Sequence, residues 1–338
     1  MENLFQRLEK NWELCLFDKK FKKKPLKNRN DSSLKVIVCV SGGSDSVALI
    51  HLLYKLRKLL FLDLHILHFN HQIRSESNQE QIFVKALAEN LKLPFYFKKN
   101  KNFFLGQPGF QEAARKWRIS ESQNLLKNIK GDYIATAHHA DDQIETVLIK
   151  MLRGVHLSKI QGMSWQNPPF IRPLLNFKKI ELEDYLKRNN QNWMNDPSNK
   201  NPKYLRNRVR LELMPLLEEL TRDSLQSRLF ALIDQSSTMR DWLDNNFQNW
   251  SKIVDKKKYI RKDILYVSDL FKVEKILQQE ILYNFISGIT GKSLSYRKLK
   301  KIFELIYKNS DYWEQHIFEQ WEISQHGREI RLINRSKT

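Results

Sequence analysis

The sequence predicts an α/β fold, a doubly wound parallel sheet followed by a smaller, mainly helical C-terminal domain. From Leu34 onward, short apolar runs alternate with amphipathic segments, which is typical of β-α-β units. A turn rich in serine and glycine directly follows the first apolar run. After about Pro215 the strand signals fade and apolar residues recur at helical spacing. We therefore expect a basic N-terminal extension at 1–30, an α/β domain at 31–216 and a helical domain at 217–338.

The expected strands are short apolar runs, and the expected helices are the amphipathic segments between them. The strands should cover residues 35–40, 62–69, 93–98 and 132–137, with a weaker strand at 170–174. The helices should cover residues 47–60, 78–91, 111–128 and 142–152. Right-handed crossovers place the carboxyl ends of such strands at one edge of the sheet, where open α/β sheets bind their ligands.

The C-terminal domain shows a helical pattern with one exception at its end. Apolar residues such as Leu225, Leu229 and Ile233, and again those from Ile264 to Ile281, have the spacing of amphipathic helices. The last apolar runs, 317–323 and 330–333, flank a turn at His326 and Gly327. This arrangement predicts a terminal β-hairpin.

The strong positive charge indicates a polyanionic partner. The chain carries 58 Lys and Arg against 38 Asp and Glu, a formal net charge of +20, and nucleic acid is the commonest polyanion. A basic surface that serves solubility alone is the alternative. The lysine-rich run between Lys19 and Lys27 favours a solvated segment, with a phosphate-contacting arm as its alternative.

Cysteine content and hydropathy exclude several other classes. The two cysteines, Cys15 and Cys39, cannot form a disulfide framework or a Cys-x-x-Cys metal site. No uncharged apolar stretch is long enough to span a membrane, and the first residues lack the apolar core of a signal peptide. We therefore expect a cytoplasmic protein without a membrane partner. The sequence leaves the oligomeric state open, a homodimer included.

The turn after the first strand has the composition of a phosphate-binding loop. Two glycines let the backbone N–H groups approach phosphate oxygens, and serine hydroxyls add donors at the start of a helix. The residues are Ser41, Gly42, Gly43, Ser44, Asp45 and Ser46. The loop lacks the Gly-Lys-Ser/Thr ending of a Walker loop. Asp45 is the candidate ligand for Mg²⁺, with an ordinary first-turn carboxylate as the alternative.

Two further groups of side chains are expected near the same edge. His68 and His71, followed by Arg74, come at the carboxyl end of the second strand. Arg115 and Arg118 lie three residues apart, so they share one face of the third predicted helix and suit a phosphate. Arginines that are solvated or paired with nearby glutamates are the alternative.

An acidic cluster follows the fourth strand. His138 and His139 precede Asp141 and Asp142, and Glu145 shares a helix face with both aspartates. Such clustered carboxylates predict a site for a cation. Helix capping explains one of the aspartates equally well.

These motifs resemble a known family. The loop hexapeptide resembles the PP-loop of the Rossmann-like ATP pyrophosphatases, which split ATP between its α and β phosphates. The segments that begin at His68, Ala114, Ile134, Arg172 and Tyr204 resemble, in the same order, motifs of the tRNA(Ile)-lysidine synthases. The resemblance spans residues 34–217 and is weak beyond them.

The resemblance implies a reaction and roles for these residues. ATP adenylates the C2 oxygen of the wobble cytidine in a CAU anticodon, and the ε-amine of L-lysine then displaces AMP. It implies that Asp142 and Glu145 bind lysine, that His68 and His71 help to bind ATP, and that Asp45, Arg118, His138, Asp142 and Glu145 take part in catalysis. The tRNA-binding residues would be Arg74, Arg115, Arg206, Asn207, Arg208 and Arg210. A carboxylate is the alternative to His138 as acceptor of the amine proton.

Three rival functions fit the sequence less well. A PP-loop tRNA thiolase would need cysteines for sulfur chemistry, and an amidotransferase would need a glutaminase domain. A non-catalytic RNA-binding protein on the same fold would not need Asp45, Asp142 and Glu145. The lysidine synthase interpretation is preferred, with the thiolase as its alternative.

Overall fold

The computed structural model describes residues 4–16, 33–70, 76–100, 110–155, 159–194, 205–222, 224–255, 264–308 and 311–337. The chain forms two compact units. Unit 1 contains residues 1–143 and 163–207, and unit 2 contains residues 144–162 and 208–338. The division at 216/217 between an α/β, ATP-binding domain and a helical, tRNA-binding domain stays a prediction.

Unit 1 is built on a six-stranded sheet in the order β3-β2-β1-β4-β6-β5. Its strands are β1 (Leu34–Cys39), β2 (Leu62–Asn70), β3 (Phe95–Lys99), β4 (Tyr133–Ala135), β5 (Gln166–Asn167) and β6 (Phe170–Ile171). All neighbouring strands pair in parallel except β5, which runs antiparallel to β6. The prediction of a mostly parallel sheet is therefore confirmed, and the weak fifth strand is a short edge hairpin.

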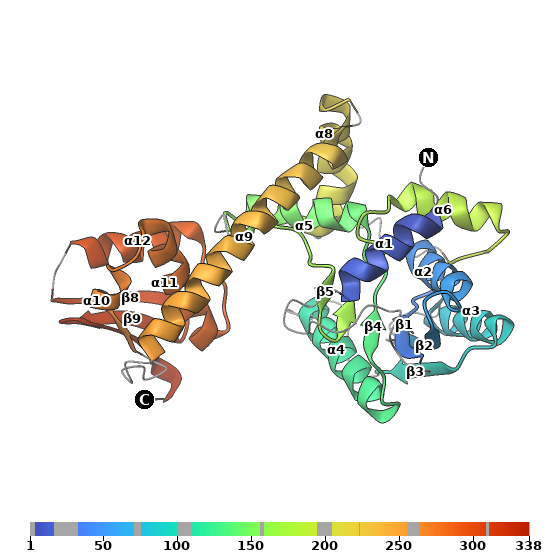
Figure 1. Cartoon of the computed structure of the whole chain (residues 1–338), viewed down its shortest axis with the longest axis horizontal. Helices are drawn as coiled ribbons and strands as arrows, with labels where there is room; N and C mark the ends of the chain where they lie inside the picture. The colour runs from blue at the N-terminus through green and yellow to red at the C-terminus, as the bar shows by residue number, and fades with distance from the viewer. Residues whose placement is uncertain are drawn as a thin grey trace. The chain divides into compact units, whose positions relative to one another are not determined.

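Helices cover both faces of this sheet (Figure 1). They are α2 (Ser44–Leu56), α3 (Glu76–Leu91), α4 (Phe110–Asn128) and α6 (Lys179–Arg188), and α5 (Ala140–Leu152) runs across the division between the units. Strand β1 shows how the sequence sets up two faces, because successive side chains of a strand point in opposite directions. Val36 and Val38 pack in one apolar cluster with α2 and α3, whereas Ile37 packs in another with α4.

An N-terminal helix also contributes to the core of unit 1. Helix α1 (Leu4–Leu16) buries Leu8, Trp12 and Cys15 completely in the cluster that contains α2. These three residues are spaced by four and three, so they share one helix face. The buried amide of Asn11 donates to the carbonyl of Pro173 at 2.7 Å. The lysine-rich run after this helix lies outside the described residues.

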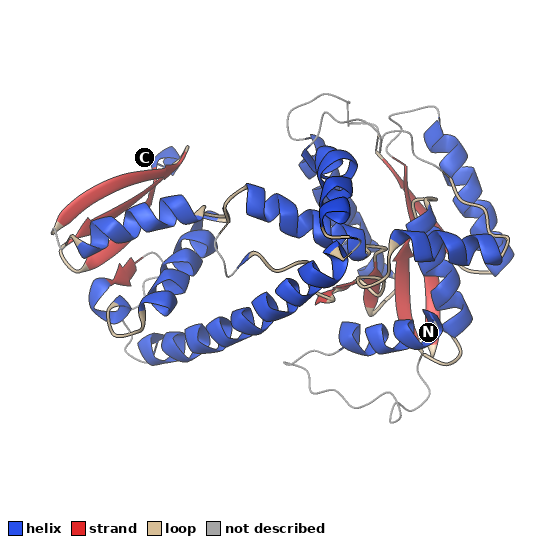
Figure 2. Ribbon diagram, turned by 90° about the horizontal axis from the view of Figure 1, so that it is seen from above, coloured by secondary structure: helices blue, strands red, loops and turns tan. Residues whose placement is uncertain are grey.

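Unit 2 combines helices with an antiparallel sheet (Figure 2). The sheet has four strands in the order β7-β10-β9-β8. The helices are α8 (Met214–Leu220), α9 (Leu225–Asp255), α10 (Val267–Leu270), α11 (Lys275–Thr290) and α12 (Tyr296–Tyr307). The strands are β7 (Ile264–Tyr266), β8 (Tyr312–Phe318), β9 (Trp321–His326) and β10 (Glu329–Asn334). Before α8 lie the short helix α7 (Leu205–Arg208) and a π-helical turn, Val209–Leu213.

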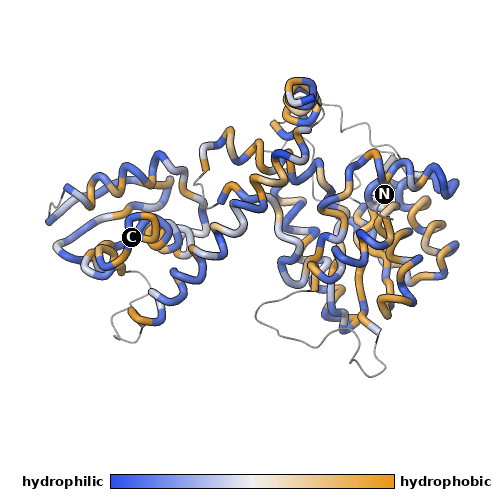
Figure 3. The backbone as a smooth tube through the Cα atoms, turned by 45° about the horizontal axis from the view of Figure 1, so that its top comes forward, coloured by the Kyte–Doolittle hydropathy of each residue, from blue (hydrophilic) through white to orange (hydrophobic). Residues whose placement is uncertain are grey.

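The predicted terminal hairpin is present as β9 and β10, but the sheet is larger than predicted. Ile264, which we expected in a helix, lies in β7, and the run 317–323 is divided between β8 and β9. In β8 the polar residues Glu314, Gln315 and His316 interrupt the apolar pattern, although Trp313 and Ile317 are buried. Within the described ranges, no helix is long and apolar enough to cross a membrane. Figure 3 shows instead that the helices alternate between hydrophobic and hydrophilic stretches.

Candidate active site

The phosphate loop connects β1 to α2 in a conformation that requires glycine. Gly42 has a backbone φ of +104°, a value that residues with a Cβ rarely adopt. The hydroxyl of Ser46 accepts from the N–H groups of Ser41 and Gly42, at 3.1 and 3.2 Å, and donates to the carbonyl of Gly43 at 3.0 Å. The expectation that Ser46 offers this hydroxyl to phosphate is therefore revised, because the hydroxyl holds the loop in shape.

The other two serines of the loop, Ser41 and Ser44, differ in exposure. Ser41 is exposed, and its Oγ accepts a long hydrogen bond from the N–H of Gly43 at 3.4 Å. Ser44 is buried, and its hydroxyl lies 3.3 Å from carboxylate oxygens of both Asp45 and Glu183. The N–H groups and dipole at this helix start suit a bound phosphate.

His139 joins the loop to the acidic cluster, and it was not among our candidate site residues. Its Nε2 lies 3.4 Å from Asp45 and 3.5 Å from Asp142, and its Nδ1 lies 3.8 Å from Asp141. The side chain is only 3% exposed. Burial alone would lower the pKa of His139, but the hydrogen bond to Asp45 and the charges of Asp142, Asp45 and Asp141 raise it to about 9. His139 is therefore an imidazolium at neutral pH.

The two carboxylates that flank His139 remain charged. Burial opposes ionisation of Asp45, yet the hydrogen bond and charge of His139 lower its pKa below the usual range. The pKa of Asp142 is lowered in the same way by His139, with help from His138 and Arg206. In the sequence this site is marked by a histidine pair that is separated from an aspartate pair by Ala140. That pattern includes His139, but it does not indicate which histidine lies between the carboxylates.

His138 has the opposite character. Its Nδ1 lies 3.0 Å from the hydroxyl of Thr136, and burial lowers the pKa of His138 to about 4 despite the nearby charge of Asp142. The guanidinium groups of Arg172, Arg206 and Arg115 lower this pKa further. His138 is therefore neutral at pH 7 and able to accept a proton, although its basicity is weak.

Two arginines of α4 and one buried arginine belong to the same neighbourhood. Arg115 and Arg118 both lie on α4, three residues apart, as expected. Arg172 is buried and donates to the carbonyl of Ser164 at 2.8 Å. The charge of Arg115 contributes to lowering the pKa of both Arg172 and Arg118, after burial itself. This mutual repulsion would be relieved by an anion.

His68 lies at the end of β2, as expected, and is almost completely buried. Its Nδ1 lies 2.9 Å from the carbonyl of Val40, and burial lowers its pKa. Its buried Nε2 has no hydrogen-bond partner among the described residues. This nitrogen is available to accept a hydrogen bond from a ligand. The other two candidates of that motif, His71 and Arg74, lie outside the described residues.

Three of the predicted tRNA-binding arginines, Arg206, Arg208 and Arg210, are paired with carboxylates. Arg206 donates to Asp142 at 3.0 Å, and Arg210 forms an ion pair with the fully buried Glu145. Arg208 makes an exposed two-pronged contact with Glu212 at 3.0 to 3.2 Å. Asn207, between them, is half-buried. The carboxylates predicted to bind lysine are thus already occupied by arginines.

The residues fit a magnesium ion only in combination with a nucleotide. Among the described residues, no group of three or more His, Cys, Asp and Glu side chains has the geometry of a metal site. Asp45, which belongs to the phosphate loop, nevertheless has a side chain that is 30% exposed. One carboxylate together with ATP phosphates is a common environment for Mg²⁺.

Comparison with known proteins agrees with this geometry. The family model of the PP-loop domain, an ATP-binding domain, matches residues 17–217. A tRNA(Ile)-lysidine synthase from Petrotoga mobilis is 31% identical over 222 residues, which cover 65% of this chain and 71% of the relative. The chain belongs to the tRNA(Ile)-lysidine synthase family.

Other members of the family are similar to the chain over a smaller share of their length. The synthase from Caldanaerobacter subterraneus is 30% identical over 81% of this chain and 60% of its own length. The synthase from Thermotoga maritima is 29% identical over 78% of this chain and 63% of its own length. The chain therefore spans about three fifths of these longer lysidine synthases.

A solved structure supports the fold. The U34-tRNA thiolase of Methanococcus maripaludis matches with a TM-score of 0.52 over 70% of this chain and 78% of the thiolase, at 16% sequence identity. At this identity the likeness concerns the fold alone. The prediction of a PP-loop fold is confirmed by both comparisons.

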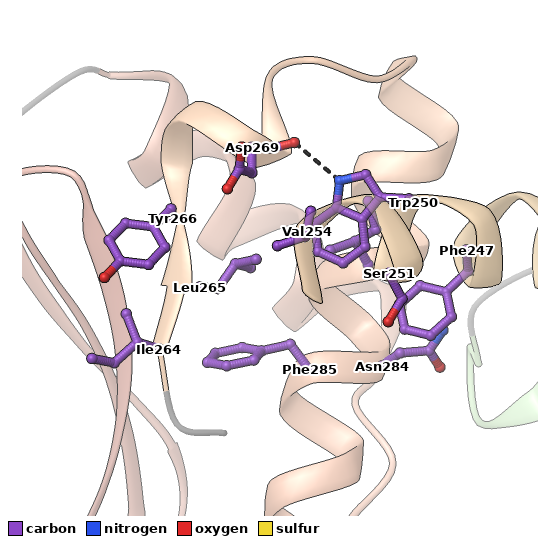
Figure 4. Close-up of a pocket in the computed structure, with 11 residues that line it drawn as sticks. Phe247, Trp250, Ser251, Val254, Ile264, Leu265, Tyr266, Asp269, Asn284 and Phe285 are labelled. Carbon is purple, nitrogen blue, oxygen red and sulfur yellow. Dashed lines mark hydrogen bonds between the residues drawn. The ribbon is translucent and has the colours of Figure 1, made fainter. Parts of the chain in front are cut away.

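A separate pocket lies in unit 2 and has different chemistry. Figure 4 shows a cavity of about 240 Å³ lined mainly by apolar and aromatic side chains, among them Phe247, Trp250 and Phe285. The indole of Trp250 donates to the backbone carbonyl of Asp269 at 3.1 Å, and the Asp269 carboxylate pairs with Lys272. Among the described residues, the lining offers no cationic side chain to a phosphate. This pocket is therefore not a candidate for the ATP site of the family.

Proposed function

We propose that this chain is an ATP-dependent ligase that joins L-lysine to the wobble cytidine of the CAU anticodon of tRNA(Ile). One observation carries the proposal: the phosphate loop and the acidic cluster meet at His139, which contacts both Asp45 and Asp142. The proposed sites for a triphosphate and for a cationic substrate would thus be adjacent, as a reaction between ATP, tRNA and lysine requires. The family relationship and the net charge of +20 support the same function.

The first step would adenylate the cytidine C2 oxygen. This oxygen attacks the α phosphate of ATP, and the bond to the β phosphate breaks to release pyrophosphate. The loop N–H groups and the start of α2 would hold the phosphates, and Arg118 would neutralise charge as the bond breaks. Asp45 would hold Mg²⁺, which when bound neutralises phosphate charge and orients the leaving pyrophosphate. The unpartnered Nε2 of His68 would accept a hydrogen bond from the nucleotide.

The second step would join lysine to the activated base. The ε-amine attacks C2, and the C2–O bond breaks to release AMP. Asp142 and Glu145 would bind the cationic groups of lysine. Before the attack the amine must lose a proton. His139 is already protonated, so of the two adjacent histidines only His138 would accept it, with a carboxylate as the alternative.

The tRNA would be held by basic side chains around this site. In unit 1 these would be Arg115, Arg206 and Asn207, and in unit 2 Arg208 and Arg210, with residues 217–338 as a tRNA-binding domain. Arginines bind phosphates through several donors, which positions a backbone without reading bases. The expected location is the cytoplasm.

The rival function, a PP-loop tRNA thiolase, needs reactive sulfur. Burial raises the pKa of the Cys15 thiol to about 12 and that of the Cys39 thiol to about 11, so both are protonated and unreactive at neutral pH. The two cysteines also lie on different elements, α1 and β1. These observations favour the ligase.

Incubation of the protein with ATP, labelled lysine and tRNA(Ile) transcripts tests the proposal. We expect lysine to enter the CAU transcript with one AMP released for each lysine, and no product with a transcript whose wobble base is uridine. Asp45→Asn should reduce ATP–pyrophosphate exchange by about 100-fold or more without unfolding the protein, since phosphate neutralisation needs its charge. Transfer of sulfur instead of lysine, or exchange at the wild-type rate in the variant, would refute the assignment.

A further inference from the structure

The carboxylate proposed to bind lysine has both of its oxygens occupied. The Oδ1 of Asp142 accepts from the guanidinium of Arg206 at 3.0 Å, and its Oδ2 faces His139 at 3.5 Å and the backbone N–H of His139 at 3.1 Å. The Asp142 side chain is only 12% exposed. The guanidinium of Arg206 therefore competes with an ammonium group for Oδ1.

Arg206 is a partner that can move. Its side chain is 48% exposed, in contrast to His139 at 3%. It is the second residue of α7, in the basic segment proposed to bind tRNA. An exposed guanidinium exchanges its partners at little cost, because solvent already screens its charge. The second proposed lysine ligand has the same kind of partner within unit 2, where Arg210 pairs with Glu145.

We propose that Arg206 stands in for the lysine ammonium in the free protein, and that a tRNA phosphate draws Arg206 away from Asp142 so that lysine can bind. The inference rests on the proposed function and adds an order of binding to it. Guanidinium groups bind phosphates through paired hydrogen bonds, so a tRNA phosphate competes with Asp142 for Arg206. The displacement leaves Oδ1 of Asp142 available to the lysine ammonium, while Oδ2 still faces His139.

The arrangement links the two substrates thermodynamically. If tRNA raises the affinity for lysine, lysine must raise the affinity for tRNA by the same factor. The free protein would then bind lysine more weakly than the complex with tRNA does. Because Arg206 is about half exposed, we expect its competition to cost up to about 1 kcal/mol, which is about fivefold in lysine affinity.

Direct measurement of lysine binding, without catalysis, tests this inference. Isothermal titration calorimetry is performed with lysine on the full chain, with and without a saturating CAU anticodon stem-loop. For the wild type we expect the stem-loop to strengthen lysine binding about fivefold. Arg206→Gln should bind lysine about fivefold more tightly than the wild type without RNA, and RNA should no longer change this affinity.

Arg208→Gln is the matched control. It removes the same charge from the same segment, but Arg208 pairs with Glu212 and not with a proposed lysine ligand. Both variants should bind the stem-loop more weakly than the wild type. Only Arg206→Gln should raise the affinity for lysine in the absence of RNA.

The outcomes separate this inference from the proposed function. If the wild type forms lysidine but Arg206→Gln binds lysine without RNA as weakly as the wild type, or more weakly, then Arg206 does not block the site and the inference is wrong. An equal rise in lysine affinity in both variants would attribute the effect to overall charge and would also overturn it. If the wild type forms no lysidine with any CAU transcript, the proposed function itself fails.

Discussion

Asp142 in unit 1 and Glu280 in unit 2 are both buried carboxylates paired with cations, yet their environments differ. The Oε1 of Glu280 accepts from Lys159, Arg240 and Asn284 at 2.9 to 3.0 Å, and both cationic side chains are at most 20% exposed. Asp142 instead pairs with Arg206, which is about half exposed, and with a histidine. One carboxylate is held by fixed partners, and the other has a partner that solvent and ligands can reach.

This difference separates a structural ion cluster from a functional one. Removing one member of a fully enclosed cluster leaves its partners buried without a counter-charge, and the cost appears in stability. Where a partner is exposed, the loss is small for the fold and the carboxylate is available for exchange. Burial of a carboxylate therefore does not identify an active site, but the exposure of its partners helps to do so.

The largest effect that we expect is on stability, from Glu280→Gln. The change leaves Lys159 and Arg240 without their shared counter-charge and should lower the free energy of unfolding by about 3 to 5 kcal/mol. Urea denaturation measures this, and ATP–pyrophosphate exchange below the melting temperature should be unchanged. Asp244→Asn is the control, because Arg240 also pairs with the exposed Asp244, and it should cost under about 1 kcal/mol. If both variants lose the same free energy of unfolding, the enclosed carboxylate Glu280 contributes no more to stability than the exposed Asp244, and the distinction between enclosed and exposed ion pairs is wrong.

The next effect is on the pH dependence of stability. The pKa of His139 is raised to about 9, above its ordinary value of 6.5, so its contribution is fully present below pH 6.5 and is lost as pH rises through 9. In protein free of Mg²⁺ and ATP, the loss should amount to about 3 to 3.5 kcal/mol. Unfolding of the wild type and of His139→Gln is compared between pH 6 and 10. A variant that retains the full slope would show that another group is responsible.

Glu145 is the carboxylate for which the comparison between Asp142 and Glu280 gives the least clear answer. Its side chain, like that of Glu280, is 0% exposed, but its partner Arg210 is 31% exposed. If Glu145 binds lysine, Glu145→Gln should raise the KM for lysine about tenfold and leave ATP affinity nearly unchanged. Lysine-dependent AMP release and ATP binding are measured on the same variant. A loss of stability with unchanged kinetics would place Glu145 beside Glu280 as a structural residue.

The smallest effect is on the salt dependence of tRNA binding. Replacing Arg208 or Arg210 by glutamine should weaken binding modestly and lower the slope of log K against log salt concentration by about one for each phosphate that the variant no longer binds. Filter-binding titrations at several salt concentrations measure the slope. Arg240→Gln, which removes a charge enclosed in the Glu280 cluster, should leave the slope as in the wild type. If the Arg208 or Arg210 variants have the same slope as Arg240→Gln, then neither Arg208 nor Arg210 binds a specific phosphate.

The sequence predicted strands β1 to β4 of the parallel sheet well, because apolar residues dominate these short segments, whereas the two-residue edge strand β5, Gln166–Asn167, was missed. The phosphate loop and the helix after β4 were also in place, although α2 begins at Ser44, three residues before the predicted start. Strand β7 was missed because its three residues become a strand only through pairing with β10. Local periodicity does not reveal such a distant partner.

The site was predictable in its residue types and less so in its pairings. Spacing placed Asp142 and Glu145 on one helix face, but it could not show that Arg206 would pair with Asp142 across 64 positions of sequence. It also could not distinguish His138 from His139, whose pKa values burial and neighbouring charges shift in opposite directions. Tertiary contacts decide which of two identical side chains is charged.

The placement of residues 144–162 in unit 2 bears on how such a protein could be divided or recombined. The PP-loop match runs through this stretch, yet Ile144 and Leu148 share a buried cluster with Leu225, and Lys159 pairs with Glu280. A fragment that stops at residue 217 would keep the phosphate loop, but it would expose these apolar side chains and remove Glu280, the carboxylate partner of Lys159. Residues 208–338 are therefore not an interchangeable module. Replacing them in evolution would also require changes in residues 144–162, in the middle of the PP-loop match.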